Sequence, residues 1–95
     1  MAPQPTVRHN VAENRFEAAT EHGAATLRYF LRGDVIDLAH TAVPQDAEGQ
    51  GIGSALAHAA LEHARKNGLK VIPSCPFVLA YLQKHKEYAD LVSQH

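Results

Sequence analysis

The sequence predicts a single α+β domain, and three observations support that prediction. Residues 7–43 alternate between apolar and polar positions, with turn residues between the runs, which is typical of antiparallel strands. From Ile52 onward the apolar residues recur at helical spacing instead. The chain has 95 residues, which is enough for one compact core but not for two.

The first half of the chain is predicted to form a four-stranded antiparallel meander. Its expected strands are 7–10, 15–19, 25–31 and 35–43, with turns at 12–14, 21–23 and 32–34. If the alternation of the fourth run is unbroken, Ile36, Leu38 and His40 share one face and Asp37 lies on the other. Residues 1–6 lack this pattern, so we expect a flexible N-terminal arm before a domain spanning 7–95.

The second half of the chain is predicted to contribute two helices and one more strand. Residues 44–51 show no periodicity and lead into a helix that ends at Asn67 and Gly68, a C-terminal cap pair. A short buried strand at 69–72 follows, and Pro76 begins a second helix that runs to about Lys84. Residues 87–92 can add one more helical turn. The predicted order is a meander, a glycine loop, a helix, a fifth strand and a C-terminal helix, with one or both sheet faces covered.

Composition excludes several classes of protein. The formal net charge is -1 and the basic residues are scattered, so we predict no nucleic-acid partner. No apolar run approaches the roughly 20 residues that span a bilayer, and the N-terminus lacks the features of a signal peptide. A single cysteine excludes an intrachain disulfide. We therefore expect a soluble, cytoplasmic protein with no membrane partner.

The histidines do not form a recognisable metal motif. The chain has 7 histidines, but zinc ligands usually come in closely spaced pairs such as H-x3-H with a second pair nearby. His58 and His63 fall on different sides of a helix, and His85 is far from His95 in sequence. We therefore predict no metal.

The glycine-rich loop at 48–53 predicts an anion site. Glycines let a backbone approach a phosphate closely, and the first turn of the following helix presents unpaired N–H groups. The alternative is a tight strand-to-helix connection without a ligand. A dinucleotide fingerprint fits poorly because the third glycine, Gly53, comes too early, and the Gly-Lys-Ser/Thr ending of a P-loop is absent.

At this loop the residues resemble a known family. The run 40–44, His-Thr-Ala-Val-Pro, and the run 48–56, Glu-Gly-Gln-Gly-Ile-Gly-Ser-Ala-Leu, resemble the acetyl-CoA signature of the GNAT N-acetyltransferase superfamily. The segments 68–78 and 85–88, with Tyr81, resemble a subfamily of very short GNAT-like acetyltransferases. The resemblance covers residues 7–92. It implies a minimal GNAT-like fold and transfer of an acetyl group from acetyl-CoA to an amine.

The resemblance also implies a binding mode for coenzyme A in a wedge between the strands 35–43 and 69–72. The pantetheine arm would pair with backbone groups of Thr41, Ala42 and Val43. The pyrophosphate would be held by amides of Gly49, Gln50, Gly51, Gly53 and Ser54. Lys84 could reach a coenzyme phosphate, although a solvated helix end is the alternative.

Two departures from the superfamily bear on function. Glu48 stands where Arg or Gln is usual, and its carboxylate would repel an exposed pyrophosphate by about 1 kcal/mol. The helices and strands that shape the acceptor pocket in larger members have no counterpart here. The alternatives are an open site, an acceptor supplied as a flexible or macromolecular amine, or a partner that completes the pocket. The amine acceptor itself, a protein, a peptide or a small amine, is left open.

Three side chains are candidates for the chemistry. His40 is placed by the resemblance near the thioester and could act as base, or it packs beside Leu38. Tyr81 matches the general acid of many GNAT enzymes, or it packs against Phe77. Cys75 lies at the mouth of the wedge, where it could accept the acetyl group, line the pocket, or be an inert buried thiol.

Three functions of different classes follow. The first is an acetyl-CoA-dependent N-acetyltransferase. The second is a coenzyme A or acyl-CoA-binding module with little transferase activity. The third is an interaction domain with a tight glycine turn.

Overall fold

The protein is described by a computed structural model in which residues 6–93 are placed. Four antiparallel strands and one parallel strand form a sheet in the order β1-β2-β3-β4-β5. Their bounds are β1 (Val7–Asn10), β2 (Arg15–Thr20), β3 (Gly23–Arg32), β4 (Val35–Ala42) and β5 (Lys70–Ile72). The predicted α+β fold with its meander and fifth strand is confirmed. The expected flexible arm falls, except for its last residue, outside the described part of the chain.

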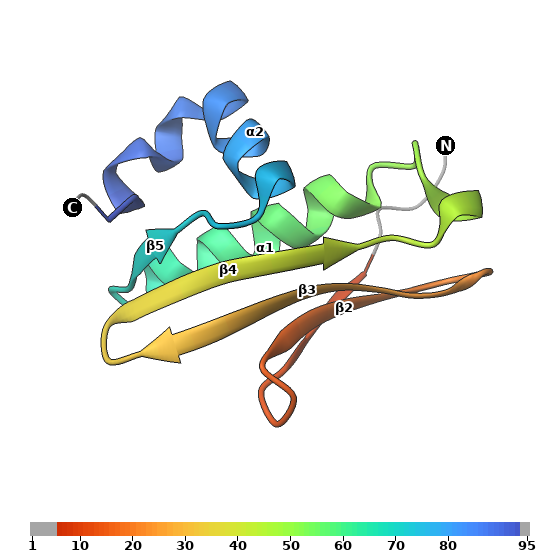
Figure 1. The fold of residues 1–95 in the computed structure, drawn as a ribbon, viewed down its shortest axis with the longest axis horizontal. Helices are drawn as coiled ribbons and strands as arrows, with labels where there is room; N and C mark the ends of the chain where they lie inside the picture. Colours follow the sequence, from red (N-terminus) through yellow and green to blue (C-terminus); the bar gives the residue numbers. More distant parts are fainter. Residues whose placement is uncertain (1–5, 94–95) are drawn as a thin grey trace.

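Two α-helices and two short 3-10 helices complete the chain. The bounds are η1 (Gln45–Ala47), α1 (Ile52–Lys66), α2 (Pro76–Lys84) and η2 (Lys86–Leu91). Helix α1 connects β4 to the parallel strand β5 and lies along one face of the sheet, with α2 above it (Figure 1). The extra helical turn predicted at 87–92 is the 3-10 helix η2. Within residues 6–93, no helix is long and apolar enough to cross a membrane.

The core lies between α1 and the sheet face beneath it. Alternate strand residues point into this core and are almost completely buried: Phe16, Ala18, Ala25, Leu27, Tyr29, Ile36, Leu38 and Val71. They meet the apolar stripe of α1, formed by Leu56, Ala60, Leu61 and Ala64. On the other face of the sheet, Arg28, Phe30 and His40 are exposed. The domain is therefore a two-layer structure, the simpler of the two layer arrangements that the sequence allowed.

A β-bulge corrects the predicted faces of β4. Arg28 pairs with His40 and its neighbour Tyr29 pairs with Leu38, so Ala39 is an extra residue without its own partner on β3. The alternation restarts after it: Thr41 lies opposite the buried Leu27, and His40 turns to the exposed face. The expectation that His40 shares a face with Ile36 and Leu38 is therefore wrong.

The chain closes over β5 after η2. Val92 pairs with Val71 in a parallel bridge, and the Ser93 amide donates to the Val71 carbonyl over 2.8 Å. Strand β5 is thus covered on both sides, by β4 and by residues 92–93. Among the described strands, only β1 has a neighbour on one side alone.

Candidate functional site

A cavity of about 470 Å³ lies at the N-terminus of α1, where β4 ends. Six of its lining residues are ones that the sequence predicted for cofactor binding: Thr41, Val43, Gly49, Gly51, Gly53 and Ser54. Ala47, Glu48, Ile52 and Phe77 complete the lining. The predicted residues Ala42, Gln50 and Lys84 are exposed and do not line this cavity.

The glycines give this cavity its open backbone wall. Gly49 and Gly51 have φ values of 85° and 76°, the left-handed region that glycine adopts without strain. A Cβ added at either would meet no heavy atom within 4 Å, so the space in front of the loop is empty of protein. Gly51 is the N-cap of α1, and the first amide to bond back to it is that of Ala55. The amides of residues 52–54 therefore lack helical partners, as an anion site requires.

Gly53 is needed for a different reason, which is contact between the two helices. Its backbone is ordinary helix, but a Cβ built there would lie 2.7 Å from Cζ of Phe77. The Phe77 ring therefore rests on the first turn of α1 and forms one wall of the cavity. The sequence pattern predicted for Phe77 only a packing contact with Tyr81. Its position in the first turn of the helix that begins at Pro76, beside the expected wedge, could have placed Phe77 at the cavity.

Thr41 and Cys75 meet beside this cavity, across the point where β4 and β5 part. Pairing between the strands ends at Asp37 and Ile72, and the Cys75 amide then donates to the Leu38 carbonyl over 2.9 Å. Beyond this, the Thr41 hydroxyl and the Cys75 thiol lie 3.3 Å apart. Strand pairing between β4 and β5 therefore ends before Cys75, which still contacts β4 through its amide and its thiol. The predicted wedge between the two strands stays a prediction.

The environment of Cys75 favours the thiolate. Its side chain is buried, which acts to raise the pKa of the thiol. Hydrogen bonds from the Thr41 hydroxyl and from the backbone of Val78, Phe77 and Thr41 outweigh burial, so the pKa lies below its ordinary value. Cys75 is also the N-cap of α2, with Pro76 in the first turn as predicted.

The other two catalytic candidates are not brought to this cavity. His40 lines a separate hollow of about 390 Å³ on the exposed face, together with Glu13, Arg28 and Phe30. Tyr81 stacks on His85, with ring centroids 4.0 Å apart, and is not part of the cavity lining. Burial, with smaller contributions from nearby carboxylates, raises the pKa of Tyr81, so its hydroxyl stays protonated near neutral pH.

Asp37 shares the exposed face with His40 because of the bulge. One of its carboxylate oxygens, Oδ1, is buried and has no hydrogen-bond partner among residues 6–93. Within the described residues, no group of three or more His, Cys, Asp or Glu side chains lies close enough together to hold a metal ion.

The comparison with protein families matches most of the chain. A family profile described as GCN5-related N-acetyl-transferase matches residues 15–91. The chain belongs to the GCN5-related N-acetyltransferase family. The family resemblance inferred from the glycine loop is thereby confirmed, and the match includes the loop, α1 and α2.

Individual relatives of this GCN5-related chain are found among animal and bacterial proteins. It is 32% identical over 82 residues to Protein NATD1 of Mus musculus, covering 83% of this chain and 74% of the mouse protein. It is 35% identical over 65 residues to Protein NATD1 of Gallus gallus, covering 67% of this chain and 59% of that protein. A solution structure of a GCN5-like candidate N-acetyltransferase from Staphylococcus aureus superposes with a TM-score of 0.73 and 35% identity. That match covers 95% of this chain and 89% of the bacterial one.

Proposed function

We propose that this protein is an acetyl-CoA-dependent N-acetyltransferase that binds the coenzyme A pyrophosphate at the start of α1. The cavity beside Gly49 and Gly51 is the observation that supports this most strongly, because it combines open space with amides that lack helical partners. The residues present fit the group: the glycines leave room for phosphate oxygens, and Thr41 and Val43 line the same cavity toward β4. Membership in the family supplies the reaction class.

The chemistry is acyl transfer to an amine. The amine nitrogen bonds to the thioester carbonyl carbon, the carbon–sulfur bond breaks, and the sulfur leaves with the bonding electrons. The acceptor nitrogen loses one proton and the departing thiolate gains one. We assign the first proton transfer to His40 and the second to Tyr81, with Cys75 lining the thioester end of the site.

His40 can serve only if the acceptor approaches from the exposed sheet face. The bulge at Ala39 turns its imidazole to that face, whereas Thr41 and Cys75 lie on the other side of the strand. Strand pairing between β4 and β5 ends at Asp37, and we propose that the acceptor amine reaches the thioester past this point. No helix of the described chain covers the exposed face, which suits an amine on a peptide or protein as well as a small amine.

Calorimetry with coenzyme A tests the binding site. Gly51→Asp should abolish binding because it places a carboxylate where the pyrophosphate is proposed, whereas Gly51→Asn should weaken it less. The matched control is Gly33→Asp, which also replaces a glycine at positive φ with open space around it, in the β3–β4 turn. Equal affinity in wild type and Gly51→Asp would show that the site is misplaced.

The alternative is a coenzyme A-binding module with little transferase activity. The observation that favours it is that neither His40 nor Tyr81 lines the cavity. The two functions differ in the His40→Gln variant, with the exposed His22→Gln as control. A transferase should lose turnover in His40→Gln while its coenzyme A affinity stays unchanged. A binding module should show no turnover in wild type and normal affinity.

A further inference from the structure

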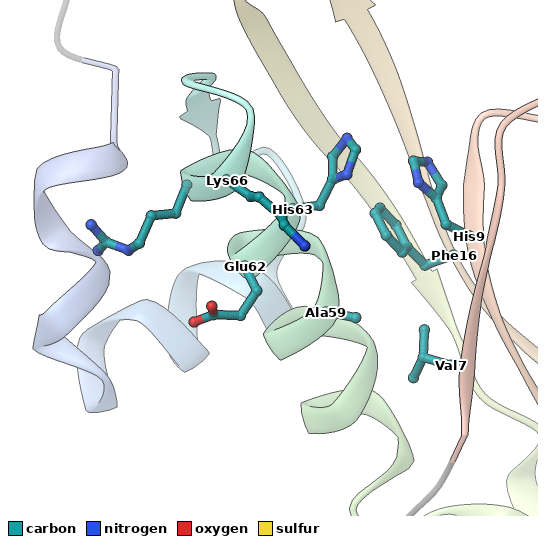
Figure 2. Close-up of a pocket in the computed structure, with 8 residues that line it drawn as sticks. Val7, His9, Phe16, Ala59, Glu62, His63 and Lys66 are labelled. Atoms are coloured by element: carbon teal, nitrogen blue, oxygen red, sulfur yellow. The ribbon is translucent and has the colours of Figure 1, made fainter.

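A second cavity, of about 550 Å³, lies at the opposite end of α1 from the glycine loop, against β1 and β2 (Figure 2). It shares no lining residue with the cavity at the α1 N-terminus. Side chains from three elements form it, chiefly Val7 and His9 of β1, Phe16 of β2, and Ala59, His63 and Lys66 of α1. Neither the family signature nor the proposed reaction gives these residues a role.

Aromatic rings and small aliphatic groups make up the floor of this second cavity. The His9 ring stacks on Phe16 with centroids 4.2 Å apart and an interplanar angle of 12°. His63 meets His9 edge to face, with centroids 4.5 Å apart. Val7 and Ala59 extend the apolar surface beside them. A ligand with a flat or aliphatic body would therefore bury its hydrocarbon part here.

Each of the two imidazoles has one ring nitrogen without a hydrogen-bond partner among the described residues, Nδ1 of His9 and Nε2 of His63. Nε2 of His9 lies 2.6 Å from the Tyr29 hydroxyl, which can donate to it and leave the proton on Nδ1. Nδ1 of His63 lies 3.2 Å from the Asn67 amide nitrogen, which donates to it and leaves the proton on Nε2. The described residues supply no acceptor for either N–H. In the tautomers with the proton on Nδ1 of His9 and on Nε2 of His63, an incoming ligand meets two donors.

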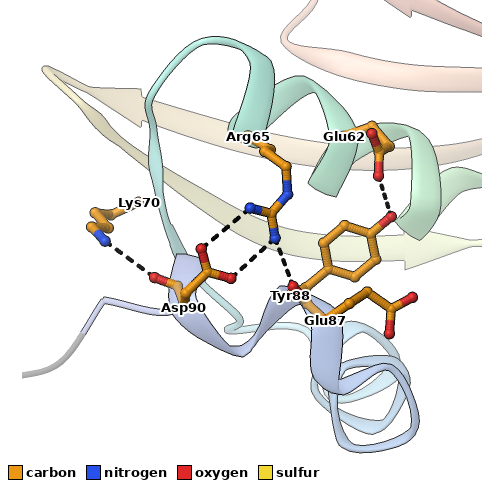
Figure 3. A network of polar contacts seen from close by, with 6 residues as sticks. All are labelled: Glu62, Arg65, Lys70, Glu87, Tyr88 and Asp90. Atoms are coloured by element: carbon orange, nitrogen blue, oxygen red, sulfur yellow. Dashed lines mark hydrogen bonds and ion pairs between the residues drawn. The ribbon is translucent and has the colours of Figure 1, made fainter.

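The charged groups around the cavity leave one cation without a protein partner. The Glu62 carboxylate points away from His9 and His63 in Figure 2 and accepts a hydrogen bond from the Tyr88 hydroxyl. Arg65 donates to both carboxylate oxygens of Asp90 (Figure 3), over 3.2 Å and 3.0 Å. Lys66, in the last turn of α1, has no ion pair with a described residue. The available positive charge at the cavity is therefore that of Lys66.

We propose that this cavity binds a small organic anion with an apolar body, namely a hydrophobic carboxylate. Its charge would be met by Lys66 and by the N–H groups of His9 and His63, and its hydrocarbon part would lie on Phe16, Val7 and Ala59. This proposal is independent of coenzyme A binding, because the two cavities have no residue in common.

Binding of such an anion should be coupled to proton uptake. Burial, and next the neighbouring His63, lower the pKa of His9, so its ring is neutral near pH 7. The groups that face it are the Tyr29 hydroxyl from β3 and His63 from α1, with Lys66, Arg65 and Glu62 of α1 at the cavity rim. A bound carboxylate favours the protonated ring, so affinity should rise as the pH falls from about 7.5 to about 5.5.

Benzoate and its neutral analogue benzamide are suitable probes. Their binding is measured by two-dimensional amide NMR on the full chain. Benzoate should cause saturable shifts at Val7, His9 and His63, and benzamide much smaller ones. Lys66→Gln should weaken benzoate binding about two- to fivefold, the range for a single exposed charge pair. Lys66 is exposed, so this variant should fold normally. Lys86→Gln, an exposed lysine away from the cavity, is the matched control and should bind as wild type does.

Three results would overturn the proposal. One is equal binding of benzoate and benzamide, which would remove the role of charge. Another is unchanged benzoate affinity in Lys66→Gln relative to Lys86→Gln. The third is a set of benzoate shifts confined to residues 49–54, which would place the anion at the glycine loop instead. His9→Gln adds a positive test, since it should reduce the rise in affinity at low pH while the binding shifts at Val7 and His63 persist.

Discussion

Gly53→Ala should introduce a strong energetic coupling between α1 and α2. The new Cβ would lie 2.7, 3.1 and 3.2 Å from three atoms of the Phe77 ring, and contacts below 3.0 Å are essentially never seen for a real Cβ. The ring must therefore move. Alanine would gain up to about 1 kcal/mol of helix propensity over glycine, while overpacking costs about 1–3 kcal/mol. Phe77 is 43% exposed and can shift toward solvent, so we expect the lower end of that cost.

The assay is a double-mutant cycle by urea unfolding, with wild type, Gly53→Ala, Phe77→Ala and the double variant. Without the Phe77 ring, the alanine keeps its helix propensity and loses its clash. Gly53→Ala should therefore be close to neutral in wild type and stabilising in the Phe77→Ala background, with a coupling of about 1–2 kcal/mol. Lys66→Ala, in the last turn of α1, should be additive with Phe77→Ala. Additivity within about 0.5 kcal/mol for Gly53→Ala as well would refute the contact.

Four further outcomes are expected. Glu48→Arg should tighten coenzyme A binding more at low salt than at high salt. If calorimetry shows no gain in coenzyme A affinity at low salt, the Glu48 carboxylate faces away from the phosphates. Saturating coenzyme A should slow the alkylation of Cys75 by iodoacetamide, as measured by intact-protein mass spectrometry. Equal alkylation rates with and without coenzyme A would indicate that Cys75 is an inert buried thiol. Tyr88→Phe should lower the free energy of unfolding by about 1 kcal/mol, because Glu62 loses its hydroxyl donor. An unchanged urea midpoint would show that water replaces that donor with no loss of stability. The free energy of unfolding should also fall as the pH drops through about 6.5, because the unfolded chain protonates His9 at a higher pH than the folded chain does. Thermal unfolding measured over a pH series tests this, and the loss of stability at low pH should be smaller in His9→Gln than in wild type.

The strands and helices were predictable because local residue types determine them. Apolar alternation located β1 and β4 to within a residue, and Pro76 marked the start of α2. The bulge at Ala39 was not predictable, because an alanine within an alternating run carries no local signal of an extra residue. It arises from how β3 and β4 align, which is a tertiary property. The orientation of His40 was wrong for that reason alone.

The candidate site was predictable where glycine chemistry determines it. Gly49 and Gly51 were recognised as an anion loop, and their positive φ values agree with that reading. The cavity near His9 and His63 was not foreseen, because those residues are far apart in sequence and meet only when α1 packs beside β1. Side-chain pairs of this kind depend on topology rather than on local pattern.

The bulge at Ala39 also makes sequence alignments within the family sensitive to where a single gap is placed. A relative whose fourth strand lacked this extra residue would alternate without interruption and would keep the residues equivalent to His40 and Thr41 on their present faces. An alignment that placed the gap after Thr41 instead would match His40 and Thr41 to residues on the opposite faces of the sheet. Site residues transferred between homologues along this strand are therefore valid only when the gap is placed at the bulge itself.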